Sequence, residues 1–149
     1  MRETINAALR LATKARDARR VSTLRLMSAA IKDRDIAART AGVSQASDAE
    51  LLELLAKMIK QREESRGIYA EAGRAELAQQ EGEEAAIIRE FLPQQLSDDD
   101  MAKAIDEAIA EVGASSMRDM GKVMGVLKGR YAGQMDFGKA SGAVKAKLS

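Results

Sequence analysis

Residues 91–97 read Phe-Leu-Pro-Gln-Gln-Leu-Ser, and Pro93 within them is the only proline in the chain's 149 residues. Proline has no amide hydrogen to donate inside a helix and disfavours helical geometry at the residue before it. A helix that reaches this segment must therefore end within it. We place a domain boundary here, which divides the chain into an N-terminal domain of residues 1–92 and a C-terminal domain of residues 93–149.

The composition favours helix on both sides of this boundary. Ala, Leu, Glu, Lys, Arg and Met are abundant, whereas the residues typical of strands are scarce. Hydrophobic residues make up 46% of the chain and charged residues 32%, a balance that forms a core and still solvates a surface. We therefore expect an all-α protein, and the absence of a signal-like apolar start predicts a cytoplasmic location.

Cysteine and histidine are both absent from the sequence. Their absence excludes disulfides, Cys/His zinc sites, thiol nucleophiles and imidazole bases. The acidic clusters lack the spacing of a calcium loop, and Gly121-Lys122-Val123 lacks the upstream glycine and following Ser/Thr of a phosphate loop. We expect no catalytic residue, no metal site and no cofactor.

Two amphipathic helices open the chain, because apolar residues recur there at helical spacing. These residues are Ile5, Leu9 and Ala12, followed by Leu24, Met27 and Ile31. We expect the two helices to pair as a hairpin. Ser47 and Glu50 then form a capping box for a third helix that runs to about Ala72, before Gly73 interrupts it. At about 1.5 Å per residue, this predicts a long, acidic helical arm of roughly 35 to 40 Å.

The C-terminal domain carries the start and stop signals of three helices. The predicted caps are Ser97 with Asp100, Ser116 with Asp119, and Asp136, and the predicted helix ends are Gly113 and Gly129. In the last helix, Phe137, Ala140, Val144 and Leu148 share one apolar face. We expect a small three-helix tail domain.

The net charge of +1 conceals alternating blocks along the chain. Residues 1–46 carry a net charge of +6 and residues 113–149 carry +5. Residues 47–92 and residues 93–112 each carry −5. Both ends of the chain are therefore basic and its middle is acidic, which favours an anionic partner for the ends.

The helix expected over residues 117–129 places glycine and basic residues opposite its apolar side. Its apolar side holds Met120, Val123, Met124 and Leu127, and its other side holds Arg118, Gly121, Lys122, Gly125, Lys128 and Gly129. Each glycine inside a helix is about 0.8 to 1 kcal/mol less favourable than alanine. Two interpretations offset that loss: an RNA backbone approaches the bare helix while the cations neutralise its phosphates, or another helix packs closely there.

The last helix repeats this design, with glycine and lysine across from its apolar face. Solvation alone also explains a basic surface, so each lysine has that alternative interpretation. The candidate nucleic-acid-binding residues of the two helices are Arg118, Gly121, Lys122, Gly125, Lys128, Arg130, Lys139, Gly142 and Lys145. The basic opening helices are a second candidate for phosphate contacts, through Arg10, Lys14, Arg16, Arg19, Arg20 and Arg25. Pairing with the acidic third helix is the alternative for these residues.

Four segments resemble the YqeY family, whose C-terminal half is similar to the tail of the GatB subunit of tRNA-dependent amidotransferases. They are Lys60-Gln61-Arg62-Glu63-Glu64-Ser65, Phe91-Leu92-Pro93-Gln94-Gln95-Leu96-Ser97, Val112-Gly113-Ala114 and Asp119-Met120-Gly121-Lys122-Val123-Met124-Gly125. The resemblance covers nearly the whole chain, and the last segment is the most specific. It implies an N-terminal helical domain joined to a small helical tail.

The resemblance also implies a role in tRNA recognition. In the amidotransferase the tail contacts the elbow of the tRNA, and YqeY-like domains fused to a glutaminyl-tRNA synthetase assist tRNA binding. Gly121, Lys122 and Gly125 are the matched positions. This chain lacks the large domain that activates and amidates charged tRNA, so we expect a non-catalytic tRNA-binding module beside an aminoacyl-tRNA synthetase or an amidotransferase. The alternatives are a protein-interaction adaptor and a subunit that contributes to glutamine-dependent carbon-nitrogen ligase activity.

Overall fold

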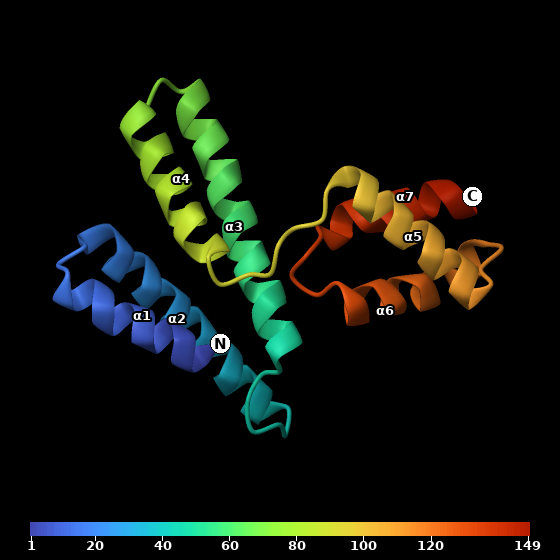
Figure 1. Cartoon of the computed structure of the whole chain (residues 1–149), viewed down its shortest axis with the longest axis horizontal. Coiled ribbons are helices and arrows are strands. Elements are labelled where there is room, and N and C mark those ends of the chain that lie inside the picture. Colours follow the sequence, from blue (N-terminus) through green and yellow to red (C-terminus); the bar gives the residue numbers. More distant parts are fainter. The chain divides into compact units, whose positions relative to one another are not determined.

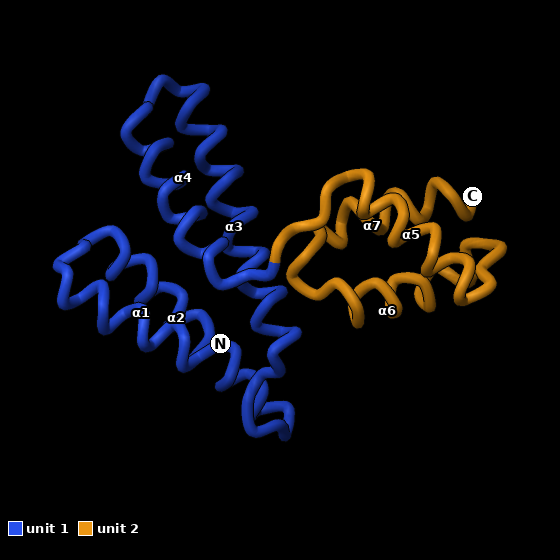
Figure 2. The backbone as a smooth tube through the Cα atoms, in the orientation of Figure 1, with its two compact units in different colours: residues 1–93 blue, residues 94–149 orange.

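The computed structural model describes residues 1–149 and is helical throughout, with seven α-helices, one short 3-10 helix and no strand. The chain divides into two compact units, Met1–Pro93 and Gln94–Ser149 (Figure 2). Their division falls one residue beyond the boundary that the proline predicts. No helix combines the length and apolar character needed to cross a membrane.

Unit 1 consists of two antiparallel helical hairpins (Figure 1). The first pairs α1 (Arg2–Lys14) with α2 (Ala18–Thr40), as the sequence predicts. The second pairs α3 (Asp48–Glu71) with α4 (Ala75–Arg89). The predicted long helix is therefore one half of a hairpin, and α4 returns along it. The chain reverses at Gly73, whose φ of +73° lies in the left-handed region that favours glycine.

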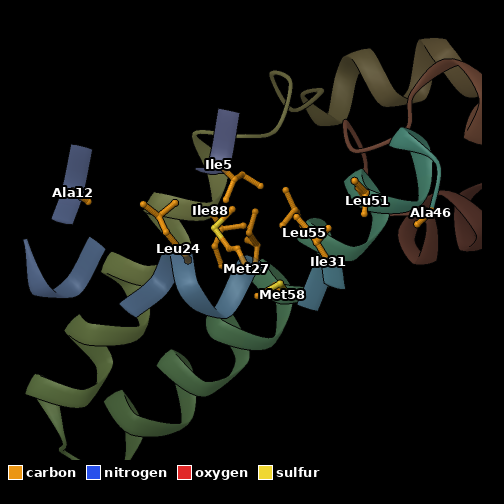
Figure 3. Packing of buried hydrophobic residues seen from close by; sticks show 12 residues of the cluster. Ile5, Ala12, Leu24, Met27, Ile31, Ala46, Leu51, Leu55, Met58 and Ile88 are labelled. Carbon is orange, nitrogen blue, oxygen red and sulfur yellow. The ribbon is translucent and has the colours of Figure 1, made fainter. Parts of the chain in front are cut away.

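The core of unit 1 forms where α2 packs against both helices of the second hairpin. Figure 3 shows Ile5, Leu24, Met27, Leu55 and Ile88 converging there from four different helices. Each of these side chains is at most 1% exposed. The core therefore joins the two hairpins into one unit.

Ion pairs reinforce the junction between the two hairpins. Arg19 of α2 reaches Glu83 and Glu84 of α4, and Arg20 contacts Glu90 at 2.6 Å. The carboxylates that pair with the basic opening helices thus lie along α4 and at its end, rather than on α3 as the alternative interpretation expected. The acidic side chains nearest these arginines therefore belong to α4 and the residue after it.

Unit 2 packs α5 (Asp98–Val112), α6 (Met120–Arg130) and α7 (Phe137–Leu148) around one core. The Ser97 hydroxyl caps α5 by accepting a hydrogen bond from the Asp100 N–H at 3.1 Å, as predicted. Gly113 ends α5 in the left-handed conformation, with a φ of +70°. Both ends of α5 are therefore fixed by local interactions that the sequence predicts.

The start of the second tail helix differs from the sequence expectation. A 3-10 helix, Met117–Asp119, precedes α6, and the Ser116 side chain makes no capping hydrogen bond. Instead, the Asp119 carboxylate accepts from the Ser115 N–H at 3.0 Å. Of the two residues predicted to begin this helix, Asp119 therefore makes the hydrogen bond, and it links the preceding loop to the first helical turn.

Candidate nucleic-acid interface

The orientation of α6 is fixed by its apolar residues. Val123 and Leu127 are completely buried, and Met120 and Met124 are half-buried against the same core. This confirms which side of the helix faces inward. The opposite side of α6 is exposed and holds Gly121, Lys122, Gly125 and Lys128. Together with the exposed Arg118 of the preceding 3-10 helix, we call these residues the α6 stripe.

The glycines of the α6 stripe lie under open space. A Cβ atom added at Gly121 or at Gly125 would meet nothing within 4 Å, and neither residue has the left-handed φ that requires glycine. No helix of unit 2 packs against them, so close packing within this unit does not explain their presence. Glycine lowers the helix propensity of α6 relative to alanine, and it does so at positions where an external molecule has direct access to the backbone.

The second stripe lies on α7, which packs against α6 and α5. Ala140, Val144 and Leu148 face the core, and Lys139, Gly142 and Lys145 are exposed on the other side. Gly142 has open space like the two glycines of α6. The structure thus places both predicted stripes on the outside of unit 2.

Gly138 has a structural reason that the sequence did not reveal. The Asp136 carboxylate caps α7 by accepting hydrogen bonds from the N–H groups of Gly138 at 2.8 Å and Lys139 at 3.4 Å. A Cβ atom at Gly138 would lie only 3.1 Å from the same carboxylate oxygen. The tight cap therefore favours glycine here, independently of any ligand.

The basic residues of unit 2 fall into two groups. Arg130 forms an ion pair with Glu111 of α5 at 2.6 Å, and this hydrogen bond raises the pKa of the Arg130 guanidinium. Lys147 is likewise paired with Asp106 of α5. Arg130 is therefore partly neutralised within the chain, which weakens its candidacy as a phosphate contact. The remaining cations make no ion pair and are exposed: Lys103 on α5, and Arg118, Lys122, Lys128, Lys139 and Lys145.

The opening helices divide in the same way. Arg19 and Arg20 are engaged by the carboxylates of α4 and its end, whereas Arg10, Lys14, Arg16 and Arg25 are exposed and make no ion pair. The sequence could not separate these groups, since the pairing depends on which surface of α2 meets α4. No group of three or more acidic side chains is arranged to hold a metal ion.

Unit 1 has an exposed apolar side chain that the sequence analysis does not identify as a functional residue. Ile36 of α2 is 52% exposed and lines an open groove between α1 and α2. A signal was present, because Ile36 stands five residues after Ile31 and so lies off the buried stripe of α2.

Comparison with known proteins identifies one family. The sequence model of the YqeY-like proteins matches residues 2–148, which is nearly the whole chain. No curated protein matches the chain. A match of this extent shows that the chain belongs to the YqeY-like family.

Proposed function

We propose that this member of the YqeY-like family is a non-catalytic accessory module that binds tRNA through the outer surface of unit 2. In this proposal the module acts in the cytoplasm, beside an enzyme of aminoacyl-tRNA formation or tRNA-dependent amidation. The α6 stripe is the observation that carries the proposal, because it combines unpaired cations with open backbone.

The chemistry of the α6 stripe suits a phosphate backbone. Lys122 and Lys128 are exposed and have no carboxylate to neutralise them, so binding a phosphate breaks no existing ion pair. Gly121 and Gly125 leave the backbone between the cations uncovered. A polyanion can therefore approach more closely than side chains would permit, and each neutralised phosphate releases condensed counterions.

Recognition of this kind would depend on the shape of the RNA backbone. Aromatic residues make up 3% of the chain, and those of unit 2, Tyr131 and Phe137, are half-buried against its core. The tail therefore offers no aromatic platform on which unpaired bases would stack. A folded tRNA, whose phosphates have fixed positions, suits such a surface better than a flexible single strand.

A titration of labelled bulk tRNA, followed by fluorescence anisotropy at several salt concentrations, tests the proposal. We expect affinity in the micromolar range at low salt, and a logarithmic salt slope that becomes shallower by about one in Lys122→Glu and in Lys128→Glu. Lys103→Glu is the matched control, because Lys103 is also exposed and unpaired in unit 2 but lies on the acidic helix α5.

Four outcomes would count against tRNA binding as stated. Absence of binding at low salt removes the function, and equal losses in all three variants remove the α6 stripe as its site. Binding of a partner protein that survives nuclease treatment and requires the open glycines would favour the adaptor instead. Glutamine-dependent amidation of mischarged tRNA, reconstituted with a partner and dependent on this chain, would favour the amidotransferase subunit.

A further inference from the structure

An open groove of about 530 Å³ lies between α1 and α2 in unit 1. Its lining extends along α2 from Ser28 to Arg39, a length of about 16 Å at 1.5 Å per residue. This length corresponds to about three helical turns. The groove belongs to a different unit from the α6 stripe, so an inference about it does not rest on the function proposed above.

The floor and one edge of the groove are apolar. Ile5 and Ile31, which are buried in the core, close it from below, and Ala29 and Ile36 lie along α2. Ile36 is 52% exposed although isoleucine is among the residues most often buried. Water covers this side chain in the free chain, so an apolar ligand would gain by displacing it.

The charge of the groove is positive. Lys32 and Arg39 are exposed and form no ion pair, although Arg39 donates to the Ser44 carbonyl at 3.3 Å. Asp35 is the acid in the lining, and Arg2 neutralises it through an ion pair of 2.6 Å. A ligand bearing carboxylates therefore meets two uncompensated cations and no free anion in the lining.

Ser28 adds a polar group to the lining of the groove. Its hydroxyl oxygen is buried, has no hydrogen-bond partner in the chain and belongs to a residue that lines the groove. A buried polar atom without a partner is uncommon in a folded protein. Rotation of the Ser28 side chain toward the groove would let this hydroxyl donate to a carboxylate or carbonyl oxygen of a ligand.

We propose that the α1–α2 groove is a docking site for an acidic amphipathic helix of a partner protein. The partner helix lays its apolar face over Ile36 and the groove floor, and its acidic flanks lie beside Lys32 and Arg39. This is the helix-in-groove mode of recognition, in which apolar residues anchor the helix and flanking charges set its specificity. A nucleic acid fits less well, because a phosphate backbone gains nothing from an exposed isoleucine.

Three defined peptides of about 16 residues, each rich in alanine, test the proposal with the full chain. The first has leucines at helical spacing with glutamates on both flanks, the second has lysines in place of the glutamates, and the third is a scramble of the first. Anisotropy gives the affinity, and amide chemical shifts in NMR spectra locate the binding surface. We expect the acidic amphipathic peptide alone to bind with micromolar affinity and to shift the amides of α1 and α2.

Matched variants separate the groove from the rest of the surface. Ile36→Ser and Lys32→Glu should each weaken peptide binding about tenfold, because one removes the apolar anchor and the other reverses a flanking charge. Ile68→Ser and Lys57→Glu on α3 replace an isoleucine that is 66% exposed and an unpaired lysine, so they should leave binding unchanged. All four positions are exposed, and their circular dichroism and Tm should confirm that the variants fold.

Several results would overturn the docking site. These are equal binding of all three peptides, no binding of the acidic peptide, or a loss of affinity in the α3 variants. Shifts of the α1 and α2 amides on adding a short RNA duplex without peptide would assign the surface to nucleic acid. A dimer in sedimentation that Ile36→Ser dissociates would assign it to a second copy of the chain.

Discussion

At the residue scale, Asp35 joins two parts of unit 1 that are distant in sequence. Its carboxylate accepts hydrogen bonds from the Arg2 guanidinium at 2.6 Å and from the Ala46 N–H at 2.9 Å. The hydrogen bond from Arg2 lowers the pKa of Asp35 most, and the Ala46 amide lowers it further. The ionised form is therefore preferred by the folded chain and links α1, α2 and the loop before α3.

This arrangement predicts a dependence of stability on pH. Because the folded pKa of Asp35 lies below the unfolded value of about 3.9, its contribution is present above roughly pH 4 and is lost as the pH falls through the lowered pKa. Asp35→Asn should lower the Tm at neutral pH, and the difference from the parent should shrink in acid. Thermal melts followed by circular dichroism across this range measure it.

Asp33→Asn is the control for this experiment, because Asp33 is exposed on the same helix and forms no ion pair. We expect its Tm to follow that of the parent at every pH. A gap between Asp35→Asn and the parent that stays constant from neutral to acidic pH would show that the ionised carboxylate does not cause it.

Gly125 allows helix propensity to be separated from ligand binding. It lies inside α6 with helical geometry and open space above it, so Gly125→Ala should stabilise unit 2 by about 0.8 to 1 kcal/mol. If an RNA backbone approaches the helix there, the added methyl group should also weaken tRNA binding. Chemical denaturation and the tRNA titration measure the two effects.

Gly67 is the matched control, since it lies inside α3 and also has open space above it. Gly67→Ala should stabilise unit 1 by a similar amount and leave tRNA affinity unchanged. Unchanged tRNA binding in Gly125→Ala would mean that the bare backbone of α6 is not approached, and the cations alone would then have to account for the affinity.

At the scale of elements, one carboxylate links three helices. Glu84 of α4 is 8% exposed and lies 3.3 Å from Arg62 of α3 and 3.9 Å from Arg19 of α2. Glu63, the neighbour of Arg62, pairs with Arg89 of α4 at 2.8 Å. The segment Lys60–Ser65, one of the four that resemble the YqeY family, therefore contributes two ion pairs that join α3 to α4.

Removal of Glu84 should be far more harmful than removal of the acid beside it. Glu84→Ala would leave Arg62, whose side chain is 14% exposed, without a carboxylate and would remove one of the two partners of Arg19, so we expect a loss of about 3 kcal/mol in the free energy of unfolding. Glu83→Ala removes an exposed partner of Arg19 and should cost less than about 1 kcal/mol. Denaturant unfolding compares them, and equal losses would contradict the role assigned to burial.

The elements themselves were largely predictable, because their ends carry local chemical signals. The Ser47 and Ser97 caps and the breaks at Gly73 and Gly113 are all present in the structure. The partners of individual charges were not predictable, as Arg130 shows. It lies beside the α6 stripe in sequence, yet it pairs with Glu111, nineteen positions away on a neighbouring helix.

The candidate interface was predictable in its orientation for a related reason. Helical periodicity assigns each residue of α6 to the core side or the solvent side, and the buried Val123 and Leu127 confirm that assignment. The α1–α2 groove needed the structure, because it depends on how two helices pack and on the engagement of Asp35 by Arg2. The periodicity of a single helix predicts neither the packing of α1 on α2 nor the Arg2–Asp35 ion pair.

At the scale of the whole molecule, each unit has a core made entirely from its own residues. The buried cluster of unit 1 extends from Ile5 to Ile88, and that of unit 2 from Ala104 to Leu148. The segment around Pro93 lies between them. Since burial of apolar surface is the main force in folding, neither unit needs the other to complete its interior.

This independence predicts the behaviour of two fragments, residues 1–93 and 94–149. Each should be helical by circular dichroism and melt cooperatively, and the smaller fragment should have the lower Tm because it buries a smaller fraction of its surface. The tail fragment should retain the tRNA affinity of the full chain within about threefold, a difference below 1 kcal/mol. The first fragment should bind the acidic peptide. A folded tail that loses tRNA binding would require unit 1 to supply part of the interface, and Arg10 and Lys14 would then be the cations to substitute first.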